Sequence, residues 1–289
     1  MQTMKEKTVL LTGGTQGIGR ATAEALAKLG AKVVLVGRDP TRIDATVKQL
    51  RAQTGNAQLH GMRADLSSQE SIRTLARDYR QEHGKLDVLI NNAGAIYMRR
   101  ELSVDGIEMT LAVNHLAYFL LTNLLLDLLK ASAPSRVVSV SSAAQRTGKI
   151  DFENLQGERK YNGISFYGQS KLANVLFSVE LARRLAGTGV TSNCLHPGVV
   201  ATGYGHNTPG FLKGLLQLFA PLMLTPEKGA RTSVYLASAP EVEKVTGKYF
   251  AKCKERAPHR SAMDPELARQ LWALSEKLTG LDLPKAKSA

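Results

Sequence analysis

The chain of 289 residues has an ordinary globular composition, with 43% apolar and 22% charged residues, which excludes a disordered or collagen-like protein. Its two cysteines, Cys194 and Cys253, are far apart and have no histidine at ligand spacing. This argues against a disulfide framework and a metal site and favours a reducing, cytoplasmic location. The formal net charge of +13 favours anionic partners, but the basic residues are scattered, so we expect a solvated basic surface and no nucleic-acid groove.

Short apolar segments alternate with helical ones along the chain. The first, at 8–12, has no polar alternation, as expected for a strand covered on both faces. Ser67, with Glu70 three residues later, is expected to open a helix as a capping box. The alternation predicts one α/β domain over 1–289, a Rossmann-type doubly wound parallel sheet of about seven strands with helices on both faces. Six strands are expected at 8–12, 32–36, 58–63, 86–91, 136–141 and 190–195, and three of the helices at 17–29, 40–51 and 165–185.

Two longer apolar segments need a separate explanation. Residues 111–129 are interrupted by Asn114, His115 and three further polar residues, which indicates a buried helix rather than a membrane span. Residues 210–224 carry a single charge and follow the sixth strand, so we expect a substrate lid at about 203–226, over the ends of the strands where ligands bind. A core helix and a peripheral membrane contact are the alternatives for this segment. We expect no transmembrane span.

A glycine-rich turn joins the first strand to the first helix. Glycines let the backbone turn sharply and approach a pyrophosphate, and the helix N-terminus supplies amide donors and a positive dipole. The spacing G-xxx-G-x-G differs from the general dinucleotide fingerprint, but its position between a strand and a helix strengthens the prediction. The residues expected to contact the cofactor here are Gly13, Thr15, Gln16, Gly17, Ile18 and Gly19.

The end of the second strand indicates which cofactor is used. Dinucleotide folds place the residue that meets the adenosine ribose about 20 residues beyond the glycine-rich turn, and an arginine nearby accommodates a 2′-phosphate. Here Gly37 leaves room and Arg38 offers a planar cation, which favours NADP. Asp39 is expected to be the N-cap of the next helix. The alternative is a surface ion pair between Arg38 and Asp39.

Tyr167 and Lys171 are spaced so that a phenol and an ammonium lie on one face of a helix. A free tyrosine has a pKa of about 10, which makes it a poor proton donor or acceptor at neutral pH. A lysine cation one turn away favours the phenolate and brings the group closer to its working range. The pair is therefore a candidate for acid–base catalysis.

With these motifs the chain resembles the short-chain dehydrogenase/reductase superfamily over nearly its whole length, from about 5 to 281. Many matches in the same order make the resemblance specific. Beyond the glycine-rich turn and the Tyr-xxx-Lys pair, the segments that carry it are Asp65-Leu66, Asn91-Asn92-Ala93-Gly94, Val113-Asn114-His115, Ser141-Ser142 and Pro197-Gly198.

The resemblance implies a role for each of these residues. Tyr167 would be the acid/base, and Lys171 would bind the nicotinamide ribose and tune Tyr167. Ser142 would orient the substrate carbonyl, and Asn114 would hold a proton-relay water. Spacing to the tyrosine favours Ser142 over Ser141, and only one of two successive strand residues can face the site. The remaining implied cofactor contacts are Asp65 and Leu66 at the adenine, Asn92, Ala93 and Gly94 along the cofactor floor, and Pro197, Gly198, Val200 and Thr202 at the nicotinamide end.

Structural explanations compete with these roles at several positions. Asn91 and Asn114 could bridge strand and helix backbones, and Asn114 could do so while also serving the site. His115 and His196 are expected to be packing residues rather than bases. Cys194 is expected to lie in the core of a strand rather than to act as a nucleophile.

Within the superfamily the chain is most similar to the retinol dehydrogenase branch, and light-dependent protochlorophyllide reductases are similar in the same segments, 114–122, 170–177, 196–200 and 271–278. The resemblance implies an NADP(H)-dependent oxidoreductase for a hydrophobic aldehyde, ketone or alcohol. The alternatives are a light-driven reductase of a ring double bond and a non-catalytic dinucleotide sensor or scaffold, which would need no proton relay. Family members often pair through the helices near Asn114 and Tyr167, so we also expect a homodimer.

Overall fold

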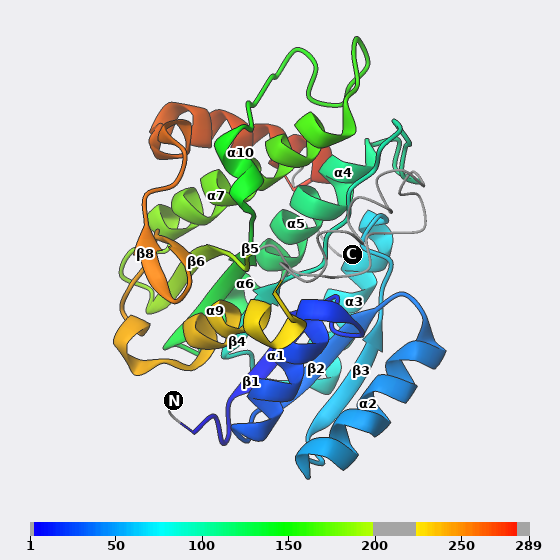
Figure 1. Cartoon of the computed structure of the whole chain (residues 1–289), viewed down its shortest axis with the longest axis vertical. Coiled ribbons are helices and arrows are strands. Elements are labelled where there is room, and N and C mark those ends of the chain that lie inside the picture. The colour runs from blue at the N-terminus through cyan, green and yellow to red at the C-terminus, as the bar shows by residue number, and fades with distance from the viewer. Residues whose placement is uncertain (1–2, 199–223, 282–289) are drawn as a thin grey trace, which may run out of the picture.

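The computed structural model describes residues 3–198 and 224–281, and these form one eight-stranded sheet in the order β3-β2-β1-β4-β5-β6-β7-β8 (Figure 1). Seven strands are parallel, and β8 pairs antiparallel with β7 at one edge. The strands are β1 (Thr8–Thr12), β2 (Lys32–Gly37), β3 (Leu59–Arg63), β4 (Val88–Asn91), β5 (Ser135–Val140), β6 (Val190–His196), β7 (Tyr249–Ala251) and β8 (Lys254–Arg256).

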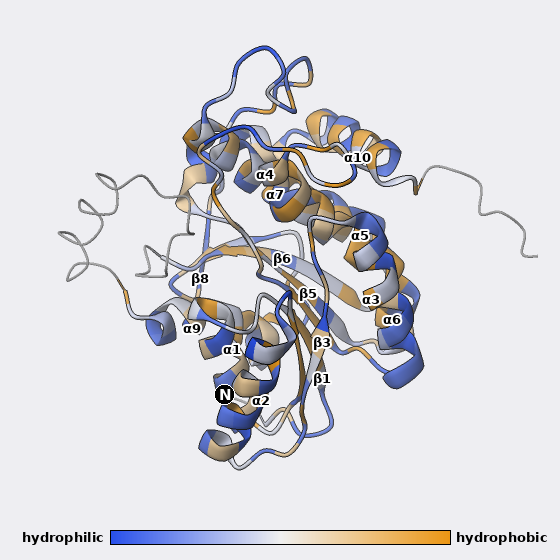
Figure 2. Cartoon of the chain, turned by 90° about the vertical axis from the view of Figure 1, so that its right-hand side faces the viewer, coloured by the Kyte–Doolittle hydropathy of each residue, from blue (hydrophilic) through white to orange (hydrophobic). Residues whose placement is uncertain are grey.

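Helices cover both faces of this sheet (Figure 2). β1 is buried along its length: Leu10 contributes to the core under one layer, while Val9 and Leu11 contribute to the core under the other. One layer contains α1 (Gly17–Lys28), α2 (Pro40–Thr54) and α9 (Pro226–Ser238). The other contains α3 (Gln69–Glu82), α5 (Ala117–Leu124), α6 (Leu126–Ala131) and α7 (Gly163–Arg184), with α10 (Pro265–Thr279) packed against α7. The predicted doubly wound α/β fold is therefore confirmed.

The strand count is eight rather than about seven, because β7 and β8 form a short hairpin. Lys252 and Cys253 connect the two strands and have φ values of 54° and 57°. Such a two-residue turn normally carries Asn or Gly, because both central residues must adopt positive φ. The sequence has neither residue there, so this turn could not be predicted from the sequence.

The predicted capping box at Ser67 is wrong by one residue. Ser68 is the N-cap of α3, and its hydroxyl accepts a hydrogen bond from the Ser71 backbone N–H. Both the backbone N–H and the hydroxyl of Ser67 instead donate to Asp65 Oδ1, at 2.9 and 2.8 Å. The carboxylate of Asp65 therefore holds Ser67 in the turn before the helix.

The apolar segment 111–129 is buried as predicted but is not one helix. It divides into the end of α4 (Met109–Leu111), the π-helix η1 (Ala112–Leu116), α5 and most of α6. Across residues 3–198 and 224–281, every helix is either too short or too polar to cross a membrane. The lid expected at about 203–226, with its apolar part at 210–224, lies almost entirely outside the described residues. Val200 and Thr202 also lie outside them.

Candidate active site

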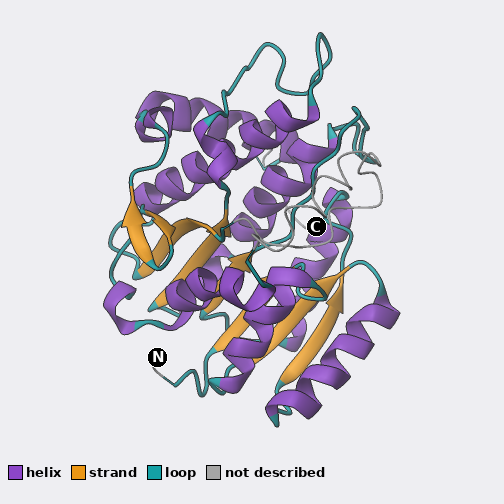
Figure 3. Ribbon diagram, viewed as in Figure 1, coloured by secondary structure: helices purple, strands orange, loops and turns teal. Residues whose placement is uncertain are grey.

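The sequence motifs follow the carboxyl ends of the parallel strands, which are drawn as orange arrows in Figure 3. The glycine-rich turn follows β1, Asn92 follows β4, Ser142 follows β5 after one residue, and Pro197 follows β6. The strand order reverses between β1 and β4, and open α/β sheets bind ligands at such a switch point. The site is therefore where the topology places it.

The glycine-rich turn leaves room for a phosphate group. Gly13 has a φ of 68°, and a side chain on Gly19 would begin 2.1 Å from the Gly13 carbonyl oxygen. Asn92 fixes the turn, because its Nδ2 donates to the carbonyls of Thr12 (2.9 Å) and Gly13 (3.2 Å). Gln16 is the N-cap of α1 and makes no side-chain capping bond, so the backbone N–H groups of the first turn remain available to an anion. These features fit a dinucleotide pyrophosphate.

Arg38 is exposed immediately after Gly37 at the end of β2. Asp39 is the predicted N-cap of α2, and its carboxylate accepts from the Arg42 backbone N–H. Among the described residues Arg38 forms no ion pair with Asp39 or with another carboxylate within 4.0 Å. Arg42, which sequence reasoning missed, reaches the glycine-rich turn: its Nη1 donates to Gln16 Oε1 at 3.3 Å. Two guanidinium groups therefore lie at the adenosine end of the expected cofactor site.

Tyr167 and Lys171 lie one turn apart on α7. Lys171 is buried, and burial lowers the pKa of its ammonium to about 8. Its Nζ donates to the Val140 carbonyl oxygen at 3.1 Å and lies 5.6 Å from the centre of the Tyr167 ring. Tyr167 is half-buried at the edge of the site. The arrangement brings a cation close to a phenol that solvent or substrate can reach.

The two serines after β5 have different surroundings. Ser141 is buried and its hydroxyl donates to the Lys171 carbonyl oxygen at 2.7 Å. Ser142 is half-exposed and begins the short helix η2 (Ala143–Arg146), which packs against α7. This packing depends on Gly148, where a side chain would begin 2.3 Å from the Gly168 carbonyl oxygen. Ser141 thus holds the fold together, and Ser142 is the serine placed beside the helix of Tyr167.

Asn114 lies in the π-helix η1, a type of irregular turn that often occurs at functional sites. Its side chain bonds the backbone of Ala95 twice, at 2.8 and 2.9 Å, and donates to the Ser170 hydroxyl at 3.1 Å. A side chain on Gly94 would begin 3.2 Å from Asn114 Oδ1 and 3.3 Å from Lys171 Nζ. The structure therefore places both Asn114 and Lys171 beside Gly94, and the Asn114 side chain links the Ala95 backbone to the Ser170 hydroxyl.

The other predicted contacts lie around this centre. Asp65 is exposed after β3, and Leu66 beside it is buried. Pro197 and Gly198, both half-buried, follow β6. Cys194 is fully buried with a free thiol, as predicted for a core residue.

Three further residues hold the site and were not predicted to do so. The Thr12 hydroxyl accepts from the N–H groups of Asn92 (2.9 Å) and Ala93 (3.1 Å). Tyr118 donates its hydroxyl to the Ala93 carbonyl oxygen at 2.7 Å, and His196 Nδ1 accepts from the Ala143 N–H at 3.1 Å. Thr12 and His196 bond the backbone that follows a neighbouring strand, and Tyr118 bonds from α5, so each depends on contacts that form only in the folded chain. Within the described ranges no group of three His, Cys, Asp or Glu side chains could hold a metal ion.

The sequence of the chain is similar to those of known proteins. The family model of the short chain dehydrogenases matches residues 7–210. The chain belongs to this family. Human retinol dehydrogenase 14 is 48% identical to it over 297 residues, covering 96% of this chain and 88% of the relative. Human retinol dehydrogenase 13 is 46% identical, covering 99% and 88%. The chain therefore falls in the retinol dehydrogenase-like branch.

Solved structures of other proteins share the fold. An uncharacterised protein from Mycobacterium paratuberculosis superimposes with a TM-score of 0.79 at 34% identity, covering 98% of this chain and 97% of that one. A short-chain dehydrogenase from Burkholderia cenocepacia, solved in complex with NADP, gives a TM-score of 0.68 at 26% identity, covering 86% and 97%. This short-chain dehydrogenase is accordingly an oxidoreductase.

Proposed function

We propose that this short-chain dehydrogenase interconverts a hydrophobic aldehyde or ketone and its alcohol with NADP(H). The observation that carries the proposal is the position of Tyr167 one turn before the buried Lys171, whose ammonium lies beside Gly94. A sensor or scaffold would need a phosphate cradle but no such acid–base pair. Light-driven reduction of a ring double bond has no support of its own, because the similar proteins described above are retinol dehydrogenases.

Bound NADPH would supply the hydride to the carbonyl carbon. Tyr167 would donate its phenolic proton to the carbonyl oxygen and take it back in alcohol oxidation. Ser142 would donate a hydrogen bond to the same oxygen and so orient the substrate. Lys171 would favour the phenolate by its positive charge, which acts strongly because burial excludes water from around its Nζ. Asn114, anchored to Ala95, would hold a water for proton relay.

The preference for NADP(H) follows from the charge at the end of β2. A 2′-phosphate needs a cation that is not already neutralised, and Arg38 is exposed with the neighbouring carboxylate of Asp39 engaged as a helix cap. Arg42 adds a second guanidinium beside Gln16. Burial raises the pKa of Tyr97, and the positive charge of Arg38 partly offsets this, so Arg38 lies within electrostatic range of Tyr97.

The test is an assay of aldehydes, ketones and alcohols of increasing chain length, followed by the absorbance of NADPH and, separately, NADH. We expect turnover in the dark, a preference for NADPH, and catalytic efficiency that rises with chain length, since each buried methylene contributes about 0.8 kcal/mol. Turnover that requires illumination would favour the ring double-bond reductase. Cofactor binding without turnover of any carbonyl or alcohol would favour a sensor.

A further inference from the structure

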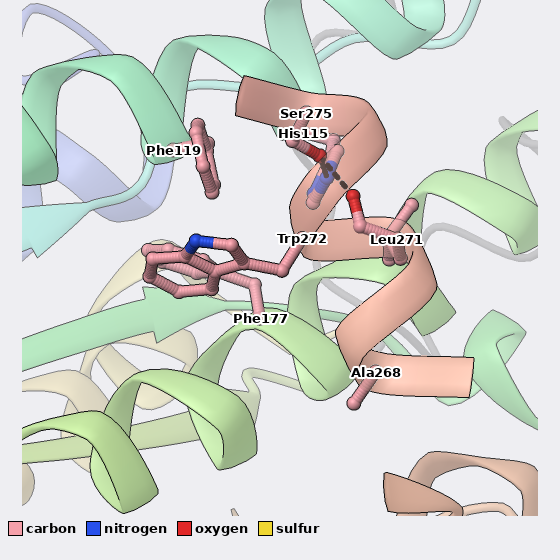
Figure 4. A pocket seen from close by; sticks show the side chains of 7 residues that line it. All are labelled: His115, Phe119, Phe177, Ala268, Leu271, Trp272 and Ser275. Atoms are coloured by element: carbon pink, nitrogen blue, oxygen red, sulfur yellow. Dashed lines mark hydrogen bonds between the residues drawn. The ribbon is translucent and has the colours of Figure 1, made fainter. Parts of the chain in front are cut away.

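A series of buried polar side chains connects α10 to Lys171. Ser275 Oγ, on α10, lies 3.0 Å from His115 Nε2, the contact drawn in Figure 4. His115 Nδ1 lies 3.4 Å from Asn174 Oδ1. Asn174 Nδ2 donates to the Val140 carbonyl oxygen at 3.4 Å, and Lys171 Nζ donates to the same oxygen at 3.1 Å. One carbonyl thus joins the candidate catalytic lysine to a network that ends on a different helix.

The direction of each hydrogen bond in this network follows from what its members can donate. A carbonyl oxygen only accepts, so the amide NH₂ of Asn174 faces Val140 and its oxygen faces His115. Complete burial lowers the pKa of His115 to about 4, so the ring is neutral and carries one N–H. That N–H lies on Nδ1 and donates to Asn174, which leaves Nε2 as an acceptor. The Ser275 hydroxyl has one proton and two acceptors within reach, His115 Nε2 at 3.0 Å and the Leu271 carbonyl oxygen at 2.7 Å. The N–H donors of His115 and Asn174 therefore both point toward Val140.

Aromatic side chains enclose the network at its α10 end. Trp272 lies edge-on to Phe119 at 4.8 Å between ring centres and parallel to Phe177 at 5.9 Å. Figure 4 shows these rings from α5, α7 and α10 beside His115 and Ser275. In such apolar surroundings water does not replace a lost partner, so each polar group depends on its neighbour in the network.

We propose that His115 and Asn174 are positioning residues for Lys171, and that α10 is thereby a working part of the site. This inference rests on the proposed function, because it needs Lys171 to serve the cofactor and Tyr167. An ammonium has three N–H groups, and the Val140 carbonyl takes one of them. With that carbonyl held by Asn174, the other two N–H groups keep a fixed direction toward the site.

The direct test is Asn174→Leu. Leucine has a similar volume and keeps the position apolar and closed to water, but it removes the hydrogen bonds to His115 and to the Val140 carbonyl oxygen. We expect NADPH to bind about two- to tenfold more weakly in a fluorescence titration, the usual weight of one hydrogen bond. We also expect the pH at which NADPH affinity begins to fall to move upward from its wild-type position. The reason is that Lys171 becomes the single donor to Val140, which stabilises its charged form.

Thr122→Val is the matched control. Thr122 is fully buried, and its hydroxyl accepts from Asn91 Nδ2 at 3.0 Å, in a contact between sheet and helix that does not touch Val140. We expect this variant to lower the unfolding temperature while leaving NADPH affinity and its pH dependence unchanged. Equal behaviour of Asn174→Leu and Thr122→Val would overturn the inference, because it would reduce Asn174 to a buried structural amide.

Ser275→Ala tests the far end of the network and is a small change that the fold should tolerate. Removing the hydroxyl leaves His115 Nε2 without its partner, so we expect the same two effects with a smaller loss of affinity, up to about threefold. An unchanged pH dependence in both Ser275→Ala and Asn174→Leu would overturn the inference. Failure of the proposed function is a separate result, because it would appear as absent turnover or absent NADPH binding in the wild-type protein.

Discussion

Tyr167 and Lys171 lie on the same face of α7, but their surroundings differ in a way that divides the chemistry between them. Lys171 is buried and hydrogen-bonded to a backbone carbonyl, whereas Tyr167 is half-buried at the edge of the site. A group that exchanges a proton with substrate must be reachable, and a group that acts by charge is most effective where water is excluded. At the residue scale, therefore, the difference in burial fits Tyr167 to exchange the proton and Lys171 to act through its charge.

Tyr167→Phe removes the exchangeable proton and little else. We expect the turnover number to fall by roughly two to four orders of magnitude, the usual weight of general acid–base catalysis, with NADPH affinity nearly unchanged. Stopped assays for turnover and fluorescence titration for binding measure the two effects separately. A variant that keeps most of its turnover number would contradict the assignment of Tyr167.

The pKa of Lys171 predicts how cofactor binding depends on pH. Because burial lowers this pKa to about 8, the ammonium is charged below that pH and neutral above it. An anionic cofactor favours the charged form, so we expect NADPH affinity to fall severalfold as the pH rises from about 7 to about 10. Lys171→Met should bind NADPH more weakly and with little pH dependence over this range. The same slope in both proteins would assign the pH effect to another group.

Arg38→Ala tests the choice between NADPH and NADH. A charged hydrogen bond of this kind contributes on the order of 1.5–3 kcal/mol, so kcat/KM with NADPH should fall tenfold or more. With NADH the change should be small. Arg269→Ala, which removes an exposed arginine paired with Glu266 on α10, is the control for loss of surface charge. An equal loss with both cofactors would show that Arg38 is structural.

At the scale of elements, the site depends on how closely η2 approaches α7. Gly148→Ala would place a side-chain carbon 2.3 Å from the Gly168 carbonyl oxygen, so the two elements must separate. Because Ser142 lies at the start of η2 and Tyr167 on α7, we expect turnover to fall along with the unfolding temperature. Gly84→Ala is the control, since a side chain there meets nothing within 4 Å. Equal activity of the two variants would show that this approach is unimportant.

The elements also show what sequence alone could predict. The buried strands and the glycine-rich turn have patterns set by local physics, namely continuous apolar runs and the need for a close backbone approach, so they were predicted with nearly correct limits. The π-helix η1 and the N-cap at Ser68 were missed, because each is decided by a contact made after folding. Asn114 is held by Ala95, and Asp65 takes Ser67 away from the helix. The proposed roles of His115 and Asn174 could not be predicted either, because they depend on contacts that form only after folding.

At the scale of the whole molecule, α10 covers the helices through which the sequence suggested a homodimer. Trp272 fills the space between Phe119 of α5 and Phe177 of α7, and the Arg184 guanidinium lies 4.2 Å from the centre of the Trp272 ring. Because that apolar surface is already buried within one chain, we expect no dimer through α5 and α7. Sedimentation at tens of micromolar should then give the mass of one chain, 31.3 kDa. A dimer mass would restore the pairing expected from the sequence.

The contact between His115 and Ser275 also has a consequence for synthesis of the protein. The two residues are 160 positions apart, so a nascent chain already carries the glycine-rich turn, Tyr167 and Lys171 well before Ser275 leaves the ribosome. Until then Phe119 and Phe177 lack the ring that covers them, and exposed apolar surface of this kind favours aggregation and binding by chaperones. The geometry around Lys171 is thus completed last, by the segment translated last among those that build the site.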